Sequence, residues 1–177
     1  MLRRIVVYGL IAGVIVAIPT SLLPVLLKGF PPQSYGMVVG YASMLIAFST
    51  IFLAIKRQRD VAGGGVIGFF PALALGLGIS IVAGIIYVLA WELAMAATHM
   101  DFAGDYARAI IAHAKAKGVT GPALAKLVAE MAQFKRDYAN PLYRFAMTFV
   151  EIFPVGVLVS VISAALLRNS RFLPARR

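Results

Sequence analysis

The sequence contains no cysteine, only two histidines and few charged residues, and each shortage excludes a class of function. Without cysteine the chain has no disulfide framework, no thiolate nucleophile and no thiolate-bound metal centre. Two histidines are too few for a histidine-rich metal centre. Charged residues make up 14% of the 177 residues, whereas a soluble domain carries about a quarter. We therefore do not expect a water-soluble globular domain.

The motifs of common enzyme classes are also missing. The sequence has no HExxH zinc motif, no GxSxG nucleophile turn, no phosphate-binding P-loop and no glycine-rich dinucleotide fingerprint. It therefore predicts a protein without catalytic residues, cofactors or bound metal.

What the sequence does contain is long apolar runs. Apolar residues make up 61% of the chain, and four runs reach the length of about 20 residues that crosses a bilayer. The sequence thus predicts an all-α polytopic membrane protein, with one membrane domain over residues 1–177. The four predicted transmembrane helices cover residues of about 5–27, 35–55, 69–98 and 142–167.

Basic residues gather at the ends of these runs, which predicts the orientation of the chain. Lys and Arg outnumber Asp and Glu by 17 to 7, but they form no single patch that would favour nucleic acid. Cytoplasmic loops of membrane proteins are enriched in Lys and Arg. With both termini in the cytoplasm, the short outer connection has only Lys28, and the inner side has Arg3, Arg4, Lys56, Arg57, Arg59, Arg168, Arg171, Arg176 and Arg177. We expect a bacterial inner-membrane protein with both termini cytoplasmic.

A cleaved signal peptide is the alternative interpretation of the first apolar run. Its 23 uncharged residues are longer than a typical signal-peptide core, and no clear A-x-A cleavage site follows. The sequence therefore favours a retained transmembrane helix.

The connection between the third and fourth runs predicts an extracytoplasmic helical hairpin over residues 101–138. Apolar residues recur at helical spacing from Phe102 and again from Leu124, with Gly118 as a stop and Thr120 and Pro122 as a new start. The apolar faces could pack on each other, lie on the outer leaflet or cover the mouth of the bundle. The sequence does not choose among these.

Each predicted transmembrane helix has small residues at every fourth position, and such stripes permit close helix packing in lipid. The stripes are Gly9 and Gly13, Gly36 and Gly40, then Gly76, Ser80 and Gly84, and finally Gly156 and Ser160. They predict packing within a four-helix bundle or an interface with a second copy or another membrane protein. Pro154 lies within the fourth run and predicts a kink there.

Two acidic residues lie within or beside the apolar runs, where a carboxylate is costly and so marks a functional hypothesis. These are Glu92 and Glu151, and Arg144, Tyr87 and His99 complete the predicted intramembrane polar network. The network predicts either an acid–arginine cluster that fixes helix register or a proton- or cation-binding site. A metal site built from Glu92, His99, Asp101 and Glu151 has weaker support, because their spacing matches no known motif.

Two tracts of the sequence and part of the third run carry a resemblance to a known family. The first tract is Gly40–Ser49, followed by Ile55-Lys56 and Arg59-Asp60. The second runs from Asn140-Pro141-Leu142 through Phe149, Glu151 and Phe153–Gly156 to Ser163-Ala164 and Leu167-Arg168. Both resemble a bacterial integral-membrane family known as domain of unknown function 4199, and Tyr87, Trp91 and Glu92 are similar to its third-span pattern. The resemblance implies a small inner-membrane protein of four helices, and it implies no activity, cofactor or substrate.

The sequence as a whole favours a non-enzymatic assembly or accessory protein in the lipid bilayer. It would act as a homodimer or with a membrane-protein partner, and its basic C-terminal tail would contact anionic lipid. One alternative is a small proton- or cation-coupled transporter that acts as a dimer. A second is a membrane-embedded enzyme that acts on lipid or envelope substrates.

Overall fold

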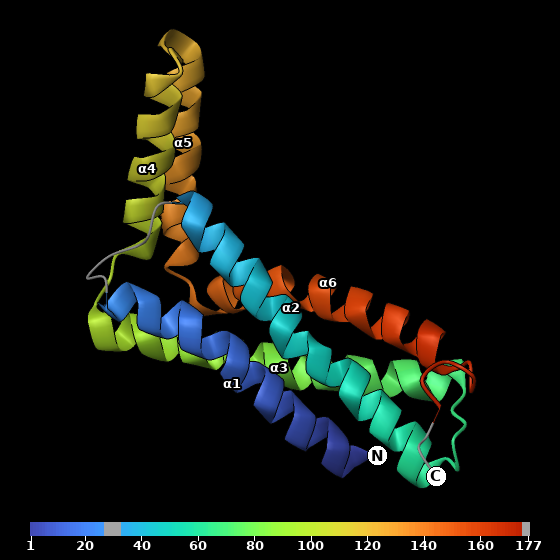
Figure 1. Cartoon of the computed structure of the whole chain (residues 1–177). Coiled ribbons are helices and arrows are strands. Elements are labelled where there is room, and N and C mark those ends of the chain that lie inside the picture. Colours follow the sequence, from blue (N-terminus) through green and yellow to red (C-terminus); the bar gives the residue numbers. More distant parts are fainter. Residues whose placement is uncertain (27–32, 175–177) are drawn as a thin grey trace. The chain divides into compact units, whose positions relative to one another are not determined.

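The computed structural model describes residues 1–26 and 33–174, and every regular element within them is helical (Figure 1). The helices are α1 (Leu2–Leu26), α2 (Gln33–Arg57), the short π-helix η1 (Gln58–Ala62), α3 (Phe69–Thr98), α4 (Phe102–Ala116), α5 (Gly121–Tyr138) and α6 (Pro141–Leu167). The predicted all-α fold is confirmed. Residue 27 of the first predicted span, the outer connection from Lys28, and Arg176 and Arg177 lie outside the described residues.

Four helices are long and apolar enough to cross a membrane: α1, α2 continued by η1, α3 and α6. These are the four predicted spans. α3 has the predicted bounds of 69–98, while α1 begins three residues before its predicted start. The second span extends beyond residue 55, because α2 includes Lys56 and Arg57 and η1 continues the helix through Arg59.

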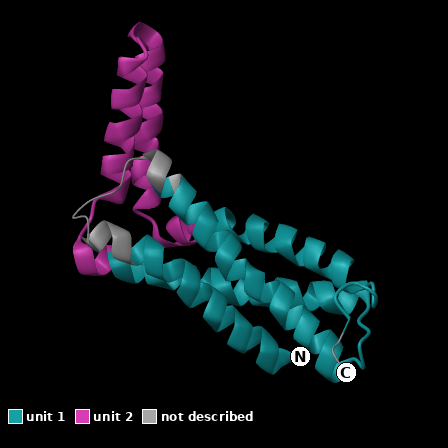
Figure 2. Cartoon of the chain, viewed as in Figure 1, with its two compact units in different colours: residues 1–94, 149–177 teal, residues 95–148 magenta. Residues whose placement is uncertain are grey.

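The chain divides into two compact units (Figure 2). The bundle unit contains residues 1–94 and 149–177, and the hairpin unit contains residues 95–148. The hairpin unit is wider than the predicted segment 101–138, because it includes the last residues of α3 and the first residues of α6.

In the bundle unit, α3 and α6 cross through a reciprocal pair of small residues. A Cβ atom placed on Gly76 would lie 2.7 Å from Ser160 Oγ, and one placed on Gly156 would lie 2.6 Å from Ser80 Oγ. The two serine hydroxyl oxygens are 3.4 Å apart. Each glycine of one helix thus faces a serine of the other, and the order of the pairs makes the two helices antiparallel.

The stripe on α1 packs against α3 in the same way. A Cβ atom on Gly9 would lie 2.6 Å from Val82 Cβ, and one on Gly13 would lie 2.7 Å from Ile86 Cβ. Both pairs are offset by the same number of residues, so α1 and α3 run parallel.

Gly40 of α2 does not pack closely against another described helix as the small residues of α1, α3 and α6 do. A Cβ atom on Gly40 would meet nothing within 4 Å, and Gly36 is half-buried one turn earlier.

Pro154 lies inside α6, which continues to Leu167. Since its nitrogen has no hydrogen, it cannot donate to the carbonyl of Val150. The kink stays a prediction.

In the hairpin unit, α4 and α5 pack on each other through four aromatic rings. Phe102 and Tyr106 of α4 lie against Tyr138 and Phe134 of α5, with ring centroids 5.3 Å and 5.5 Å apart, respectively. Of the three ways to bury the apolar faces, the structure therefore shows packing of the two helices against each other. The sequence signals at the ends are also present: α4 ends just before Gly118, which has φ +80°, and Pro122 lies in the first turn of α5.

Asp101 begins α4 as its N-cap and also ties α4 to α5. Its side chain accepts a hydrogen bond from the Gly104 amide at 3.0 Å and forms an ion pair with Lys135 at 2.7 Å. The hydrogen bond from Lys135, followed by that from the Gly104 amide, lowers the pKa of Asp101 below its ordinary value. The carboxylate form is thus the one that stabilises this end of the hairpin.

We expect Asp101→Ala to speed amide hydrogen exchange in the first turn of α4 about fivefold at neutral pH, because losing an N-cap costs about 1 kcal/mol. A lowered folded-state pKa contributes stability above the unfolded-state pKa, and this stability is lost as the pH falls through the folded-state pKa. The difference between native and variant chains should therefore shrink below about pH 4. Asp105→Ala is the control, since the ion pair that Asp105 forms within the described residues is with exposed Arg108. An equal effect of both variants would contradict the capping role.

Candidate functional site

The predicted polar network is divided between the two units. Tyr87 is buried and Glu92 is half-buried on α3, and both belong to the bundle unit together with Glu151 of α6. His99 and Arg144 belong to the hairpin unit. The pairing of Arg144 with either acid, and the proton- or cation-binding role, stay predictions.

Within the hairpin unit, Arg144 is held at the end of α5. Its guanidinium donates to the carbonyl oxygen of Tyr138 at 3.2 Å and lies 5.8 Å from the centre of the Tyr138 ring. His99 is exposed directly after α3, with φ +52° and with its amide donating to the carbonyl of Met95. His99 therefore ends α3 in a left-handed conformation that is uncommon for residues other than glycine.

Glu151 is an exposed residue of α6 within the single chain, and its part in the predicted network stays a prediction. It has no hydrogen bond or ion pair with any residue in 1–26 or 33–174. The reason is the rotation of α6, whose buried side carries Ile152, Gly156 and Ser160. The apolar residues Leu158 and Ile162, two and three turns further on, are exposed on the same side as Glu151.

No metal site is formed by the described parts of the chain. Within them, no group of three or more His, Asp or Glu side chains is placed to hold a metal ion. Glu92 and Glu151 belong to the bundle unit and His99 and Asp101 to the hairpin unit, so a metal site built from all four stays a prediction.

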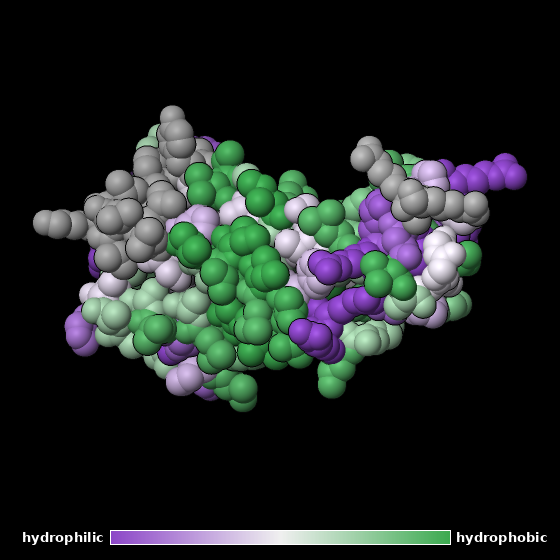
Figure 3. Space-filling model, turned by 60° about the horizontal axis from the view of Figure 1, so that its bottom comes forward, coloured by the Kyte–Doolittle hydropathy of each residue, from purple (hydrophilic) through white to green (hydrophobic). Residues whose placement is uncertain are grey.

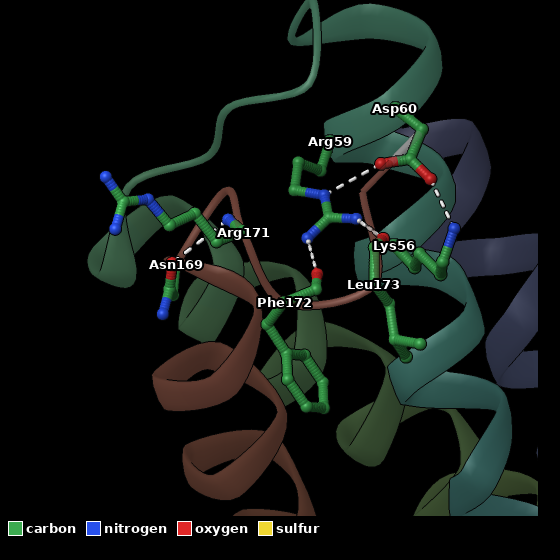
Figure 4. Close-up of polar contacts among 7 residues, drawn as sticks. All are labelled: Lys56, Arg59, Asp60, Asn169, Arg171, Phe172 and Leu173. Atoms are coloured by element: carbon green, nitrogen blue, oxygen red, sulfur yellow. Dashed lines mark hydrogen bonds and ion pairs between the residues drawn. The ribbon is translucent and has the colours of Figure 1, made fainter. Parts of the chain in front are cut away.

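The most completely bonded charged group is Arg59, at the end of the bundle where α2 terminates (Figure 4). Its side chain is 0% exposed. Its Nε donates to Asp60 Oδ1 at 2.7 Å, while its two terminal nitrogens donate to the carbonyl oxygens of Phe172 at 2.8 Å and Leu173 at 2.5 Å. Lys56 pairs with the other oxygen of Asp60 at 2.5 Å. Arg59 thus binds the segment after α6 to the end of α2.

The local sequence explains this position. The π-helix η1 carries Arg59 beyond the apolar part of α2, and the turn that follows contains Gly64 and Gly65 at φ +59° and +90°. After α6, Asn169 accepts the backbone amide of Arg171 at 3.0 Å, and the Phe172 ring packs edge-to-face on Phe52 at 6.4 Å. These two turns place the guanidinium beside the carbonyls.

The sequence prediction used Arg59 as a marker of orientation and as part of the family resemblance, and it missed this anchor. The available signal was the pair Arg59-Asp60 shortly before Gly63-Gly64-Gly65, where a charge pair precedes a tight turn. The Arg59 cluster is therefore a structural anchor between η1 and the segment after α6.

The basic residues that the structure describes in the bundle unit lie at one end of that unit. Arg4 of α1 donates a hydrogen bond to Gln58 of η1, and Arg59 joins η1 to the segment after α6. The basic residues at this end are Arg3, Arg4, Lys56, Arg57, Arg59, Arg168 and Arg171. The acidic residue placed among them is Asp60.

Comparison with known proteins gives a family and no activity. No curated protein matches the chain, and no solved structure matches it. The sequence model of a family described as "Protein of unknown function (DUF4199)" matches residues 7–169, which include all four candidate membrane spans almost completely. The chain belongs to this DUF4199 family.

Proposed function

We propose that this protein is a non-enzymatic membrane protein that assembles with a second copy of itself through the exposed side of α6. The observation that carries the proposal is the exposed Glu151 carboxyl, which has no partner within residues 1–26 and 33–174. A carboxyl group that faces lipid is costly unless another polar group satisfies it. A second α6 supplies such a group.

The surroundings of Glu151 support this interface. Val150, Leu158 and Ile162 are exposed apolar side chains on α6. Symmetric association places the same side of both helices together. Two Glu151 carboxyls can then share a proton and a hydrogen bond, which is worth about 1 to 2 kcal/mol between helices in lipid.

The basic end of the bundle unit supports an orientation with both termini in the cytoplasm of a bacterial inner membrane. Lys and Arg beside spans favour the cytoplasmic side. In this orientation Arg168 and Arg171 of the C-terminal tail contact the anionic lipid of the inner leaflet.

Cysteine crosslinking tests the interface, because the chain contains no cysteine of its own. We expect Leu158→Cys to form a disulfide-linked dimer in lipid nanodiscs under mild oxidation. Leu53→Cys on α2 is the matched control, since Leu53 and Leu158 are 54% and 59% exposed. Adding Glu151→Leu to Leu158→Cys should reduce dimer formation about tenfold, whereas Glu151→Gln, which still hydrogen-bonds, should reduce it less.

Equal crosslinking at Leu53→Cys and Leu158→Cys would contradict this interface. No crosslinking at Leu158→Cys, together with proton release near neutral pH that Glu151→Gln abolishes, would favour the proton-coupled transporter.

A further inference from the structure

The bundle unit has a second site, a basic cavity where α1 begins and α2 ends. The cavity has a volume of about 560 Å³, within the usual range for small-ligand sites. Its charged and polar lining residues are Arg3, Arg4, Arg57, Gln58 and Tyr8. We propose that this cavity binds the phosphate headgroup of an anionic phospholipid.

The charge of the cavity is positive and is not neutralised from within. Three guanidinium groups line it and no carboxylate does. Asp60, the nearest acid along the chain, is already paired with Lys56 and Arg59. Arg3 and Arg57 form no ion pair with any residue of the described ranges. Two arginines without a counter-ion favour an external anion, and a phosphate accepts bidentate hydrogen bonds from each guanidinium.

One wall of the cavity is already fixed in position. Arg4 donates to the side-chain oxygen of Gln58, so the start of α1 is held to η1. Arg3 and Arg57 therefore project from two helices whose ends are joined. A site held in advance loses less entropy when it binds.

The position of the cavity places it at the level of lipid headgroups. Arg3 and Arg4 directly precede the uncharged run from Ile5, and Arg57 directly follows the apolar part of α2. This holds whichever side of the membrane the cavity faces. Guanidinium groups at the ends of spans lie at the interface, where phosphates are concentrated.

An apolar track leads away from the cavity along α1 and favours a lipid over a free phosphate ion. Val7 lines the cavity, and Ile11, Val14 and Ile18 follow it at helical spacing, all of them exposed. Figure 3 shows apolar side chains over the middle of the face in view, with the largest group of hydrophilic side chains to its right and smaller groups at its left edge and bottom. Acyl chains can lie along the track while the headgroup occupies the cavity.

The test is the thermal unfolding of the purified full-length chain in neutral detergent, with phosphatidylglycerol, phosphatidylcholine or inorganic phosphate added. A ligand that binds the folded state raises the Tm in a concentration-dependent way. We expect phosphatidylglycerol alone to raise the Tm of the native chain. Replacing both cavity arginines, Arg3→Gln with Arg57→Gln, should weaken the apparent affinity by about tenfold or more, because two charge-assisted contacts are lost. This test does not depend on the proposed self-association, since the substitutions lie on α1 and α2 and leave α6 unchanged.

The matched control removes the same charge from outside the cavity, through Lys115→Gln with Lys117→Gln, two exposed lysines of the hairpin unit. This control should keep the response to phosphatidylglycerol. An equal loss in both double variants would overturn the proposal and leave only general charge attraction. A response to inorganic phosphate equal to that for phosphatidylglycerol would overturn the lipid assignment, and no response to any of the three would overturn the site.

Discussion

Arg59→Leu is expected to lower the Tm of the chain by roughly 10 °C and to release the segment after α6. The guanidinium is fully buried and bonded to Asp60 and to the carbonyls of Phe172 and Leu173. Removing one partner from a buried charged group costs about 3 kcal/mol or more. In a chain of this length that corresponds to roughly 10 °C. Differential scanning fluorimetry in detergent measures the shift.

The released segment gives a second, independent readout. Trypsin should cleave after Arg171 much faster in Arg59→Leu than in the native chain, because the two carbonyl contacts hold that segment in place. Arg57→Leu is the control, since it removes the same charge from the exposed neighbouring position. A Tm and cleavage rate for Arg59→Leu that match those of Arg57→Leu would show that the anchor does not stabilise the protein.

Gly76→Leu is expected to have the other large effect, with loss of stable folded protein. The first carbon of any side chain at residue 76 would lie 2.7 Å and 2.8 Å from the Oγ and Cβ atoms of Ser160. Since Ser160 is itself fully buried on α6, neither helix can yield without separating. Overpacking of a close-packed site costs about 1 to 3 kcal/mol even for small additions. Size-exclusion chromatography and thermal unfolding measure the outcome.

Gly40→Leu is the matched control for this substitution. Gly40 is also a helical glycine within a membrane span, but a Cβ atom there meets nothing within 4 Å. We expect the Tm of the Gly40→Leu variant to equal that of the native chain or to exceed it slightly, because leucine favours the helix more than glycine does. A large loss of stability from Gly40→Leu, equal to that from Gly76→Leu, would contradict the α3–α6 packing.

The fold could be predicted from the sequence because its signals are local. A run of about 20 apolar residues specifies a spanning helix without reference to the rest of the chain. The helical hairpin follows from the same kind of signal, since Gly118 and Pro122 mark where one helix ends and the next begins. For this reason the observed bounds of α3, Phe69–Thr98, agree with the bounds that the sequence predicts.

The candidate site was less predictable because it depends on which side of each helix faces inward. Glu151 and Ile152 are neighbours in sequence, yet one is exposed and the other is fully buried. Almost every residue around them is apolar, so the polar–apolar contrast that reveals the rotation of a soluble helix is missing. Arg59 was missed for a different reason. Its main partners are backbone carbonyls 113 and 114 residues away, and backbone groups carry no sequence signal.

The reciprocal crossing of α3 and α6 has a consequence for how sequences of this family vary. The crossing contains two glycine–serine pairs, Gly76 with Ser160 and Gly156 with Ser80. In each pair the side chain of one helix is a single hydrogen and that of the other is a hydroxymethyl group, so the two side chains share one space. What selection must preserve is the combined volume of each pair and not the identity of either residue. We expect positions 76 and 160 to covary among relatives, as do 80 and 156, because an enlargement on one helix is tolerated only with a reduction on the other.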